Sequence, residues 1–159
     1  MMGVGKTTVG RLLADRLGWA FWDNDEALMT ETGKTAGDVQ RADGESGLHA
    51  VEDRLLREAL TSEVPTVLAA AASVVLDPSV VDRACTVWLR ASPSTEAQNI
   101  AHSGQHHRPL GADGAAVLKR LSAARETMYA RLADITVDTD VEPATTCERV
   151  AAALAVRQR

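Results

Sequence analysis

Hydrophobic side chains recur at helical spacing in several stretches of the chain. Residues 6–17 predict a helix that ends before Gly18. Its apolar face holds Val9, Leu12, Leu13 and Leu17. The same helical spacing of hydrophobic residues recurs strongly over residues 48–60. Further helices are expected at residues 25–32, 35–42, 114–132 and 143–157.

Short apolar runs of strand length separate these helices. Strands are expected at residues 20–22, 66–70, 85–90 and 135–138. Minor features are a helical turn or two at 79–83, a helix start at 92–95 and an aperiodic loop at 103–113. Strands that alternate with helices are typical of an α/β fold with a parallel sheet covered on both faces. We therefore expect one such domain over residues 1–159.

The composition is consistent with one α/β domain, and it argues against some classes of function. Of 159 residues, 45% are hydrophobic and 25% are charged, as in ordinary globular domains. Lys and Arg total 17 against 22 Asp and Glu, and the net charge of −5 argues against a nucleic-acid partner. No apolar run is long enough for a membrane span. Cys85 and Cys147 lack metal or redox spacing, which favours reduced thiols in a cytoplasmic protein.

A glycine-rich turn opens the chain and leads directly into the first helix. The second half of the phosphate-binding pattern G-x-x-x-x-G-K-[ST] is matched by Gly3, Gly5, Lys6 and Thr7. The first glycine of that pattern, and the strand that leads into it, fall ahead of Met1. We therefore expect a sheet without its first strand and a natural start codon upstream. The alternative is a glycine-rich helix start with an unrelated lysine.

The residue types in this turn suit a nucleotide phosphate. Small residues let consecutive N–H groups converge on phosphate oxygens, and the helix N-terminus carries the positive end of its dipole. Lys6 supplies a point charge, and Thr7 supplies a hydroxyl for Mg²⁺. The candidate phosphate-binding residues are Gly3, Val4, Gly5, Lys6, Thr7 and Thr8.

Two carboxylates follow the strand expected at residues 20–22. Asp23 and Asp25 stand two residues apart, so one can face a metal while the other faces a substrate. The alternative is a solvated turn in which Asn24 or Asp25 caps the next helix.

The combination of motifs resembles the shikimate kinase family. Besides residues 3–18 and the helix of Glu52, the matching segments are Asp23-Asn24-Asp25, Asp43-Gly44-Glu45, Arg108-Pro109-Leu110 and Val137-Asp138-Thr139. The resemblance implies a three-layer α/β/α P-loop kinase with a lid at about residues 102–114. It also implies transfer of the γ-phosphoryl group of ATP to a ring hydroxyl of shikimate, with Mg²⁺, in aromatic amino-acid biosynthesis. We expect a cytoplasmic monomer that acts on a small molecule.

The resemblance assigns roles to individual residues. Lys6 would hold the phosphates, Thr7 would bind Mg²⁺, and Asp23 would lie near the metal. Asp25 would bind the substrate and accept the proton of the attacking hydroxyl. Arg108, in the lid, would close over the phosphates and stabilise the charge of the transition state.

Arg125 matches the family arginine that grips the substrate carboxylate, a task that suits the guanidinium fork. Without the resemblance, both Arg125 and the lid arginine Arg108 are ordinary solvated residues. The lid also contains His106 and His107, which we expect to be solvated rather than metal-binding.

The acceptor side departs from the family pattern. His49, mostly neutral at pH 7, stands where the family has a second arginine. Where the family has a Gly-Gly-Gly turn, the chain has Ala71, Ala72 and Ser73, whose side chains should crowd a ligand and strain any position of positive φ. Ala101 replaces a further lid arginine, and residues 140–142 lack basic side chains.

The candidate substrate-binding residues are therefore Asp25, His49, Ala72 and Arg125. The departures leave two alternatives to a shikimate kinase. One is a kinase-like protein that binds a ligand or partner without turnover. The other is a P-loop kinase for a different small acceptor, such as a sugar acid.

Overall fold

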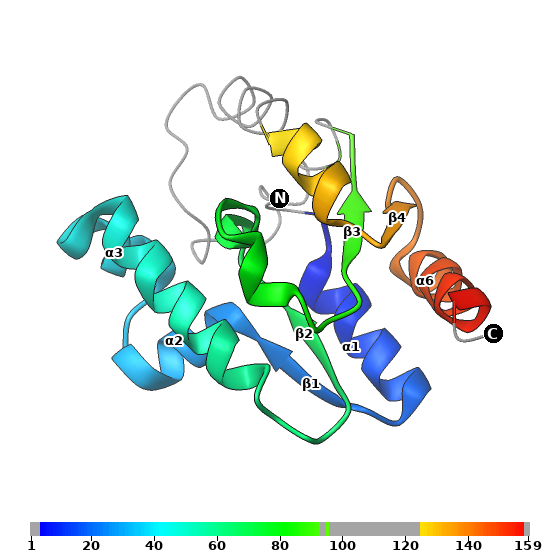
Figure 1. Ribbon diagram of the computed structural model, residues 1–159, viewed down its shortest axis with the longest axis horizontal. Coiled ribbons are helices and arrows are strands. Elements are labelled where there is room, and N and C mark those ends of the chain that lie inside the picture. The colour runs from blue at the N-terminus through cyan, green and yellow to red at the C-terminus, as the bar shows by residue number, and fades with distance from the viewer. Residues whose placement is uncertain (1–3, 93–94, 96–124, 158–159) are drawn as a thin grey trace.

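The fold was obtained as a computed structural model, which describes residues 4–92, 95 and 125–157. Helices and short strands alternate along the chain, as the hydrophobic pattern predicts (Figure 1). The elements up to the second strand are α1 (Lys6–Leu17), β1 (Ala20–Asp23), α2 (Asn24–Thr32), α3 (Ala36–Ala59) and β2 (Thr66–Ala69). Then follow the 3₁₀ helices η1 (Ala72–Leu76) and η2 (Pro78–Val81), β3 (Val87–Arg90), a helix at 125–132, β4 (Ile135–Asp138) and α6 (Pro143–Arg157).

The strands form two separate parallel pairs. β1 pairs with β2 from Ala20 opposite Thr66 onward, and β3 pairs with β4 from Val87 opposite Ile135 onward. Parallel pairing confirms the expected topology. The expected single sheet is, however, divided into two pieces, because among the described residues no strand lies between β2 and β3.

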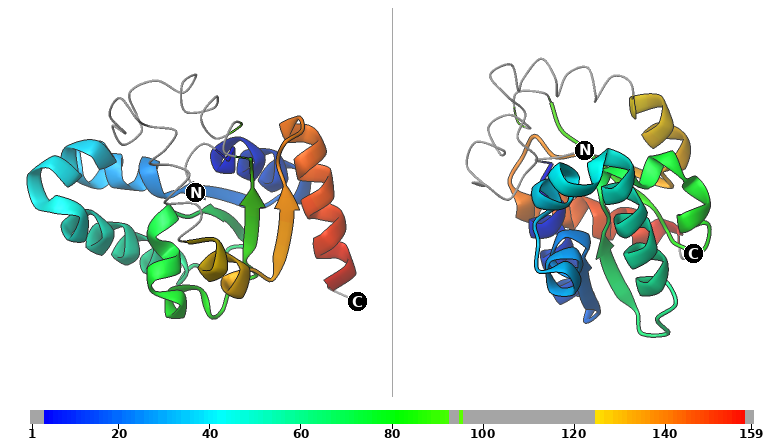
Figure 2. Two further views of the ribbon diagram at one scale, coloured as in Figure 1. Left: turned by 90° about the horizontal axis from the view of Figure 1, so that it is seen from above. Right: turned by 90° about the vertical axis from the view of Figure 1, so that its left-hand side faces the viewer.

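Helices cover both faces of the strands, which confirms the three layers (Figure 2). On one face α1 and α6 pack together over Val67, Leu89 and Val137. On the other face Leu68 packs with the end of α3 and with η2, while Trp88 packs with η1 and the helix at 125–132. The alternation between Val67 and Leu68 is the period of two expected for a strand with two covered faces.

The first helix has the predicted boundaries. It ends where Gly18, at φ 67°, donates its N–H to carbonyls of the last turn. Gly10 sits on the face that meets β1, and a Cβ there would lie 2.7 Å from the Phe21 ring. Glycine therefore allows the close approach of α1 to the strand.

The span α3 (Ala36–Ala59) consists of two helices joined across a kink, which agrees with the two helices expected at 35–42 and 48–60. Its capping box joins Thr35 and Asp38. The kink is at Gly44, with φ 75° and ψ −179°, which is backbone that only glycine adopts readily. The expected Asp-Gly-Glu turn is therefore the non-helical point between the two helices, and the helical residues extend closer to it than the sequence predicted.

Other boundaries differ by one or two residues, as at β2, β3 and η2. Of the helix expected at 114–132, the part at 125–132 is described and helical. The loop at 103–113 and the lid lie outside the described residues. No helix within the described ranges is both long and apolar enough to cross a bilayer.

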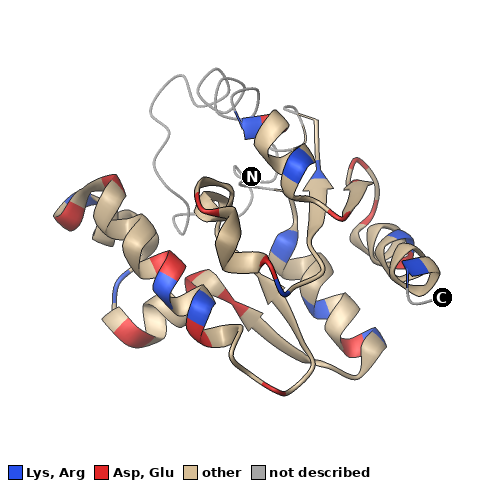
Figure 3. Cartoon of the chain, viewed as in Figure 1, with Lys and Arg blue, Asp and Glu red and all other residues tan. Residues whose placement is uncertain are grey.

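Charges of both signs are mixed along the outer helices (Figure 3). Arg54 of α3 pairs with Glu31 of α2, and Arg57 pairs with Asp77 at the start of η2 at 2.7 Å. These exposed pairs each contribute little to stability, about 0–1 kcal/mol. They do place α2 and η2 against the helix that carries His49 and Glu52.

Candidate active site

The start of α1 and the carboxyl end of β1 meet at one edge of the strands. The N-terminus of α1 points toward this edge because α1 runs back along β1 and β2. Gly5 precedes the helix with φ 86°, a left-handed conformation that glycine adopts without strain. Val4 is buried beside it, at 3% exposure. Of the turn, the described part places a left-handed glycine directly before the helix start.

One hydrogen bond connects the turn with the carboxylate pair. The Thr7 hydroxyl donates to Asp23 Oδ2 at 2.7 Å. The other carboxylate oxygen of Asp23 accepts the N–H of Asp25 at 2.9 Å. Asp23 is buried, at 6% exposure, so each of its oxygens has a defined partner in a low-dielectric setting.

The N-cap of α2 is Asp23. Sequence reasoning offered Asn24 or Asp25 for this role, and that alternative is wrong, because both lie inside the first turn. The cap fixes the Asp23 side chain and leaves Asp25 on the exposed surface of the helix start. Asp23 is thus bonded to the phosphate turn, while Asp25 lies on the exposed surface.

Asn24, which the sequence offered only as a helix cap and as part of the family match, is a buried polar residue. It is 1% exposed, and neither atom of its amide has a hydrogen-bond partner within the described part of the chain. Burial without a partner costs about 1–3 kcal/mol. Asn24 lies between Asp23 and Asp25 in the first turn of α2.

The oxygens of Thr7 and Asp23 suit Mg²⁺. A hydroxyl and a carboxylate are hard oxygen ligands, and Mg²⁺ commonly takes only one or two protein ligands and completes its shell with water and phosphate. In the described ranges no cluster of three or more His, Cys, Asp or Glu side chains is placed to hold a metal. The Thr7 hydroxyl and the Asp23 carboxylate fit a Mg²⁺ whose remaining ligands are phosphate and water.

Lys6 occupies a different position from the expected one. Its half-buried side chain lines the cavity between β2 and β3, together with Val4 and Leu56. Thr8 is exposed on the first turn of α1. Gly3 and Arg108 lie outside the described residues, as do His106 and His107.

The acceptor side is built from α3, η1 and the helix at 125–132. Ser73 of η1 donates its hydroxyl to Glu52 Oε2 of α3 at 2.5 Å. Glu52 is buried, at 8% exposure, so this bond joins the two elements in a protected place. His49 lies one turn earlier on α3, with its Nε2 3.6 Å from Glu45 Oε1.

A second hydrogen bond attaches the helix at 125–132 to η1. The Tyr129 hydroxyl donates to the Ala72 carbonyl at 2.9 Å, and the Tyr129 ring stacks on Trp88. Arg125 is half-buried and precedes Tyr129 by four residues, so the two share one helix face. Tyr129 thus connects the helix that carries Arg125 with the segment that contains Ala72.

The expected strain at residues 71–73 is absent. Ala71 has φ −60° and ψ 156°, and Ala72 begins the 3₁₀ helix η1. No residue other than glycine has positive φ within the described ranges. The prediction failed because Ala71 is extended and residues 72–76 form a short helix, conformations in which alanine and serine are unstrained.

Comparison with known proteins identifies the family. The shikimate kinase family model matches residues 2–155. The chain belongs to the shikimate kinase family. A shikimate kinase of Symbiobacterium thermophilum is 34% identical over 145 residues, which is 88% of this chain and 83% of that protein. One of Thiobacillus denitrificans is 36% identical over 87% of this chain and 78% of its own length.

Solved structures agree with this assignment. The chain is similar to the shikimate kinase of Acinetobacter baumannii in complex with shikimate, with a TM-score of 0.90 and 26% identity over 98% of this chain and 89% of that one. The shikimate kinase of Aquifex aeolicus matches with a TM-score of 0.83 at 22% identity, which supports the fold. The P-loop kinase fold expected from the sequence is confirmed.

The bonds that assemble the acceptor side were missed by sequence reasoning. Ser73 was considered only as an obstacle, and Tyr129 was not considered at all. The signal for Tyr129 was present, because a tyrosine in an apolar helix face needs a partner for its hydroxyl. No signal in the sequence pointed to Ser73 as the partner of Glu52.

Proposed function

We propose that this chain transfers the γ-phosphoryl group of ATP to a hydroxyl of shikimate, giving shikimate 3-phosphate and ADP. The observation that carries the proposal is the bond between Thr7 and Asp23. It brings the phosphate turn to the carboxylate pair, in a chain of the shikimate kinase family. We further propose that residues 1–159 act as a single domain.

The nucleotide would be held at the start of α1. Backbone N–H groups from Gly3 to Thr8 and the charge of Lys6 bind the phosphates. Thr7 and Asp23 hold Mg²⁺, which supplies charge neutralisation at the transferring group when it is bound. In this role the Lys6 side chain must leave the cavity wall and turn toward the phosphates.

The acceptor would be held between α2, α3 and the helix at 125–132. Asp25 orients the attacking hydroxyl and takes its proton while the oxygen–phosphorus bond forms and the bond to ADP breaks. Arg125 holds the carboxylate of the acceptor, and His49 and the Ala72 segment border it. Catalysis is mainly positioning and charge stabilisation. The role of Arg108 over the phosphates stays a prediction, as do the cytoplasmic location and the monomeric state.

The test is an assay of ADP release with three acceptors: shikimate, quinate and gluconate. We expect ADP release that depends on shikimate, with weak or no response to the other two. Lys6→Met should abolish it, because a neutral side chain cannot balance the phosphate charge. Turnover with gluconate alone would support the sugar-acid alternative. Binding of Mg-ATP without turnover for any acceptor would refute the proposal and support a binding protein.

A further inference from the structure

The 3₁₀ helix η1 lies between α3 and the helix at 125–132 (Figure 1). One hydrogen bond joins η1 to each of these neighbours. The Ser73 hydroxyl donates to Glu52 of α3, and the Ala72 carbonyl accepts from Tyr129 of the other helix. Two consecutive residues of η1 are therefore attached to the two helices on either side of it.

Each of these hydrogen bonds lies one helical turn from a candidate acceptor-binding residue. His49 precedes Glu52 by three residues on α3, and Arg125 precedes Tyr129 by four residues on the other helix. Residues three or four apart share one face of a helix. The separation between His49 and Arg125 therefore depends on where η1 holds the two helices.

Both hydrogen bonds lie in protected places. Glu52 is 8% exposed and Tyr129 is 7% exposed. The distance of 2.5 Å from Ser73 Oγ to Glu52 Oε2 is in the range for a hydroxyl that donates to a carboxylate. Hydrogen bonds in surroundings of low dielectric constant are stronger than those in water. The two bonds thus hold a defined spacing, which the exposed ion pairs of the outer helices do not.

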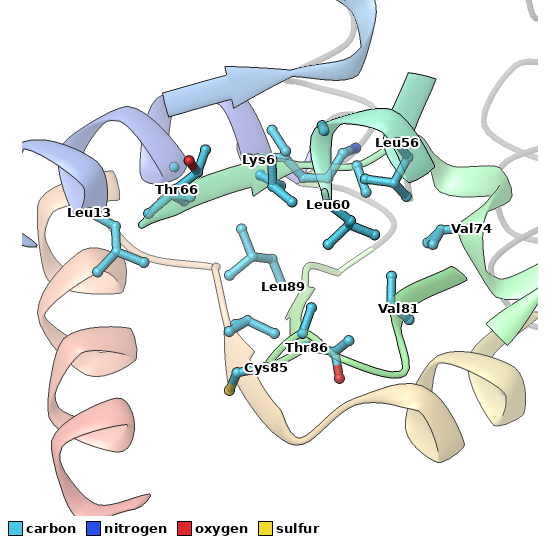
Figure 4. Close-up of a pocket in the computed structure, with 18 of the residues that line it drawn as sticks. Lys6, Leu13, Leu56, Leu60, Thr66, Val74, Val81, Cys85, Thr86 and Leu89 are labelled. Carbon is cyan, nitrogen blue, oxygen red and sulfur yellow. The ribbon is translucent and has the colours of Figure 1, made fainter. Parts of the chain in front are cut away.

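Apolar side chains hold η1 on its buried side. Val75 is 1% exposed and packs in a cluster with Trp88. Val74 packs with Leu56 of α3 and with Val81, where all three line the cavity between β2 and β3 (Figure 4). Because this packing involves neither hydroxyl, removal of one hydroxyl should leave η1 folded and change only its position.

We infer that η1 is a spacer that sets the distance between His49 and Arg125 across the acceptor site. The hydroxyls of Ser73 and Tyr129 are positioning groups for the acceptor. Each hydroxyl bonds to another part of the protein, so it acts on the acceptor only through the side chain one turn away. The inference rests on the proposed function and adds the feature that matches the width of the site to one acceptor.

A purely structural role of the two hydroxyls has a different consequence. In that case, loss of a hydroxyl lowers stability, but the protein that remains folded binds the acceptor as before. With a spacer, the folded protein itself loses affinity for the acceptor. A comparison of KM for the acceptor with KM for ATP separates the two cases, because α1 and β1 hold the nucleotide end.

The test measures steady-state rates of Tyr129→Phe and Ser73→Ala with shikimate and Mg-ATP. Phenylalanine keeps the ring that stacks on Trp88 and removes only the oxygen. KM for shikimate should rise about 3- to 10-fold in each variant, as for the loss of one buried hydrogen bond. Both kcat and KM for ATP should stay within about twofold, because the acceptor carboxylate is held equally before and during phosphoryl transfer.

Thr86→Val is the matched control. The Thr86 hydroxyl donates to the Leu132 carbonyl at 2.6 Å, so it holds the same helix at the end away from Arg125. Its loss should lower the free energy of unfolding as much as Tyr129→Phe does and leave KM for shikimate within about twofold of the parent value. Urea denaturation of each variant measures the stability.

The double variant tests whether the two hydrogen bonds act through one spacer. A spacer loses its setting when either end is released, so release of the second end adds little. KM for shikimate in the variant with both Ser73→Ala and Tyr129→Phe should therefore stay within about twofold of the larger single effect. Two independent contacts would instead multiply their effects.

Three results would overturn the spacer while the parent chain still phosphorylates shikimate. The first is an unchanged KM for shikimate in both single variants. The second is an equal rise of that KM in Thr86→Val, and the third is multiplication of the single effects in the double variant. If Ser73→Ala does not fold, Tyr129→Phe and Thr86→Val decide alone. Absence of shikimate-dependent ADP release by the parent chain would refute the proposed function, and the spacer with it.

Discussion

The phosphate end and the acceptor end of the site are built in different ways. At the phosphate end, Thr7, Asp23 and Asp25 come from adjoining elements, α1, β1 and α2, and match the family pattern. At the acceptor end, the bonds run from Ser73 to Glu52 and from Tyr129 to Ala72, across separations of 21 and 57 residues. This end carries the departures from the pattern.

The difference shows where a family site can change. The phosphate end depends on a tight turn and a helix N-terminus, so each residue is fixed by backbone geometry. The acceptor end depends on side chains that bridge separate elements. There Ser73 lies in a 3₁₀ helix and donates its hydroxyl to the buried carboxylate of Glu52. The acceptor side is thus changed and still tied together.

Thr7→Val should produce the largest effect and would break the phosphate end. Valine has the shape of threonine and lacks the hydroxyl that pairs with Asp23 and that we assign to Mg²⁺. We expect kcat to fall by about 100- to 1,000-fold, as when one preorganised polar group is removed from an active site. Steady-state rates against Mg-ATP concentration measure this.

The control is Thr30→Val, which removes an exposed hydroxyl from α2. It should leave kcat within about twofold, since the hydroxyl bonds only to its own helix. Equal losses in both variants would mean that the Thr7 hydroxyl has no special role.

Arg125→Lys should produce the next largest effect, confined to the acceptor end. Lysine keeps the charge and loses the planar fork that binds two carboxylate oxygens. We expect KM for shikimate to rise about 10- to 100-fold, which corresponds to one charged hydrogen bond. KM for ATP should not change. Arg131→Lys, on an exposed turn of the same helix, is the matched control.

Ser73→Ala tests the bond that is peculiar to this acceptor end. Glu52 loses the hydroxyl that it accepts at 2.5 Å while it remains buried. The free energy of unfolding should fall by about 1–2 kcal/mol. Urea denaturation measures it, and Ser79→Ala, whose hydroxyl bonds to exposed Asp77, should change it far less. No loss of stability in Ser73→Ala would mean that the bond does not support the acceptor side.

His49→Arg should produce the smallest effect and sharpen the comparison. Arginine carries a permanently charged planar fork that can bind both oxygens of a carboxylate, and a histidine ring has no such fork. KM for shikimate should therefore fall severalfold in His49→Arg, while KM for ATP should not change. Steady-state rates at a series of shikimate concentrations measure this. An unchanged KM for shikimate would show that residue 49 does not face the carboxylate.

Local pattern was enough to predict most elements of the fold. The bounds of α1 and β4 agree with the prediction, because a glycine stop or an apolar run between polar residues defines them. The break between the two helices of α3 was also predictable, since Gly44 adopts a backbone conformation there that other residues disfavour. At the site, the glycine turn and the carboxylate pair were visible in the sequence. The residue that caps α2 could not be predicted, because Asp23, Asn24 and Asp25 could each serve as its N-cap.

The sequence by itself determined the order of helices and strands, the phosphate turn and the family, since each depends on residues close together in the chain. Only the tertiary structure decided that Ser73 meets Glu52, that Tyr129 fixes the helix of Arg125, and that two parallel pairs flank an apolar cavity. Such contacts join residues far apart in sequence, and their partners are selected by packing and by the need of every buried polar group for a hydrogen bond. No spacing rule along the chain encodes that choice.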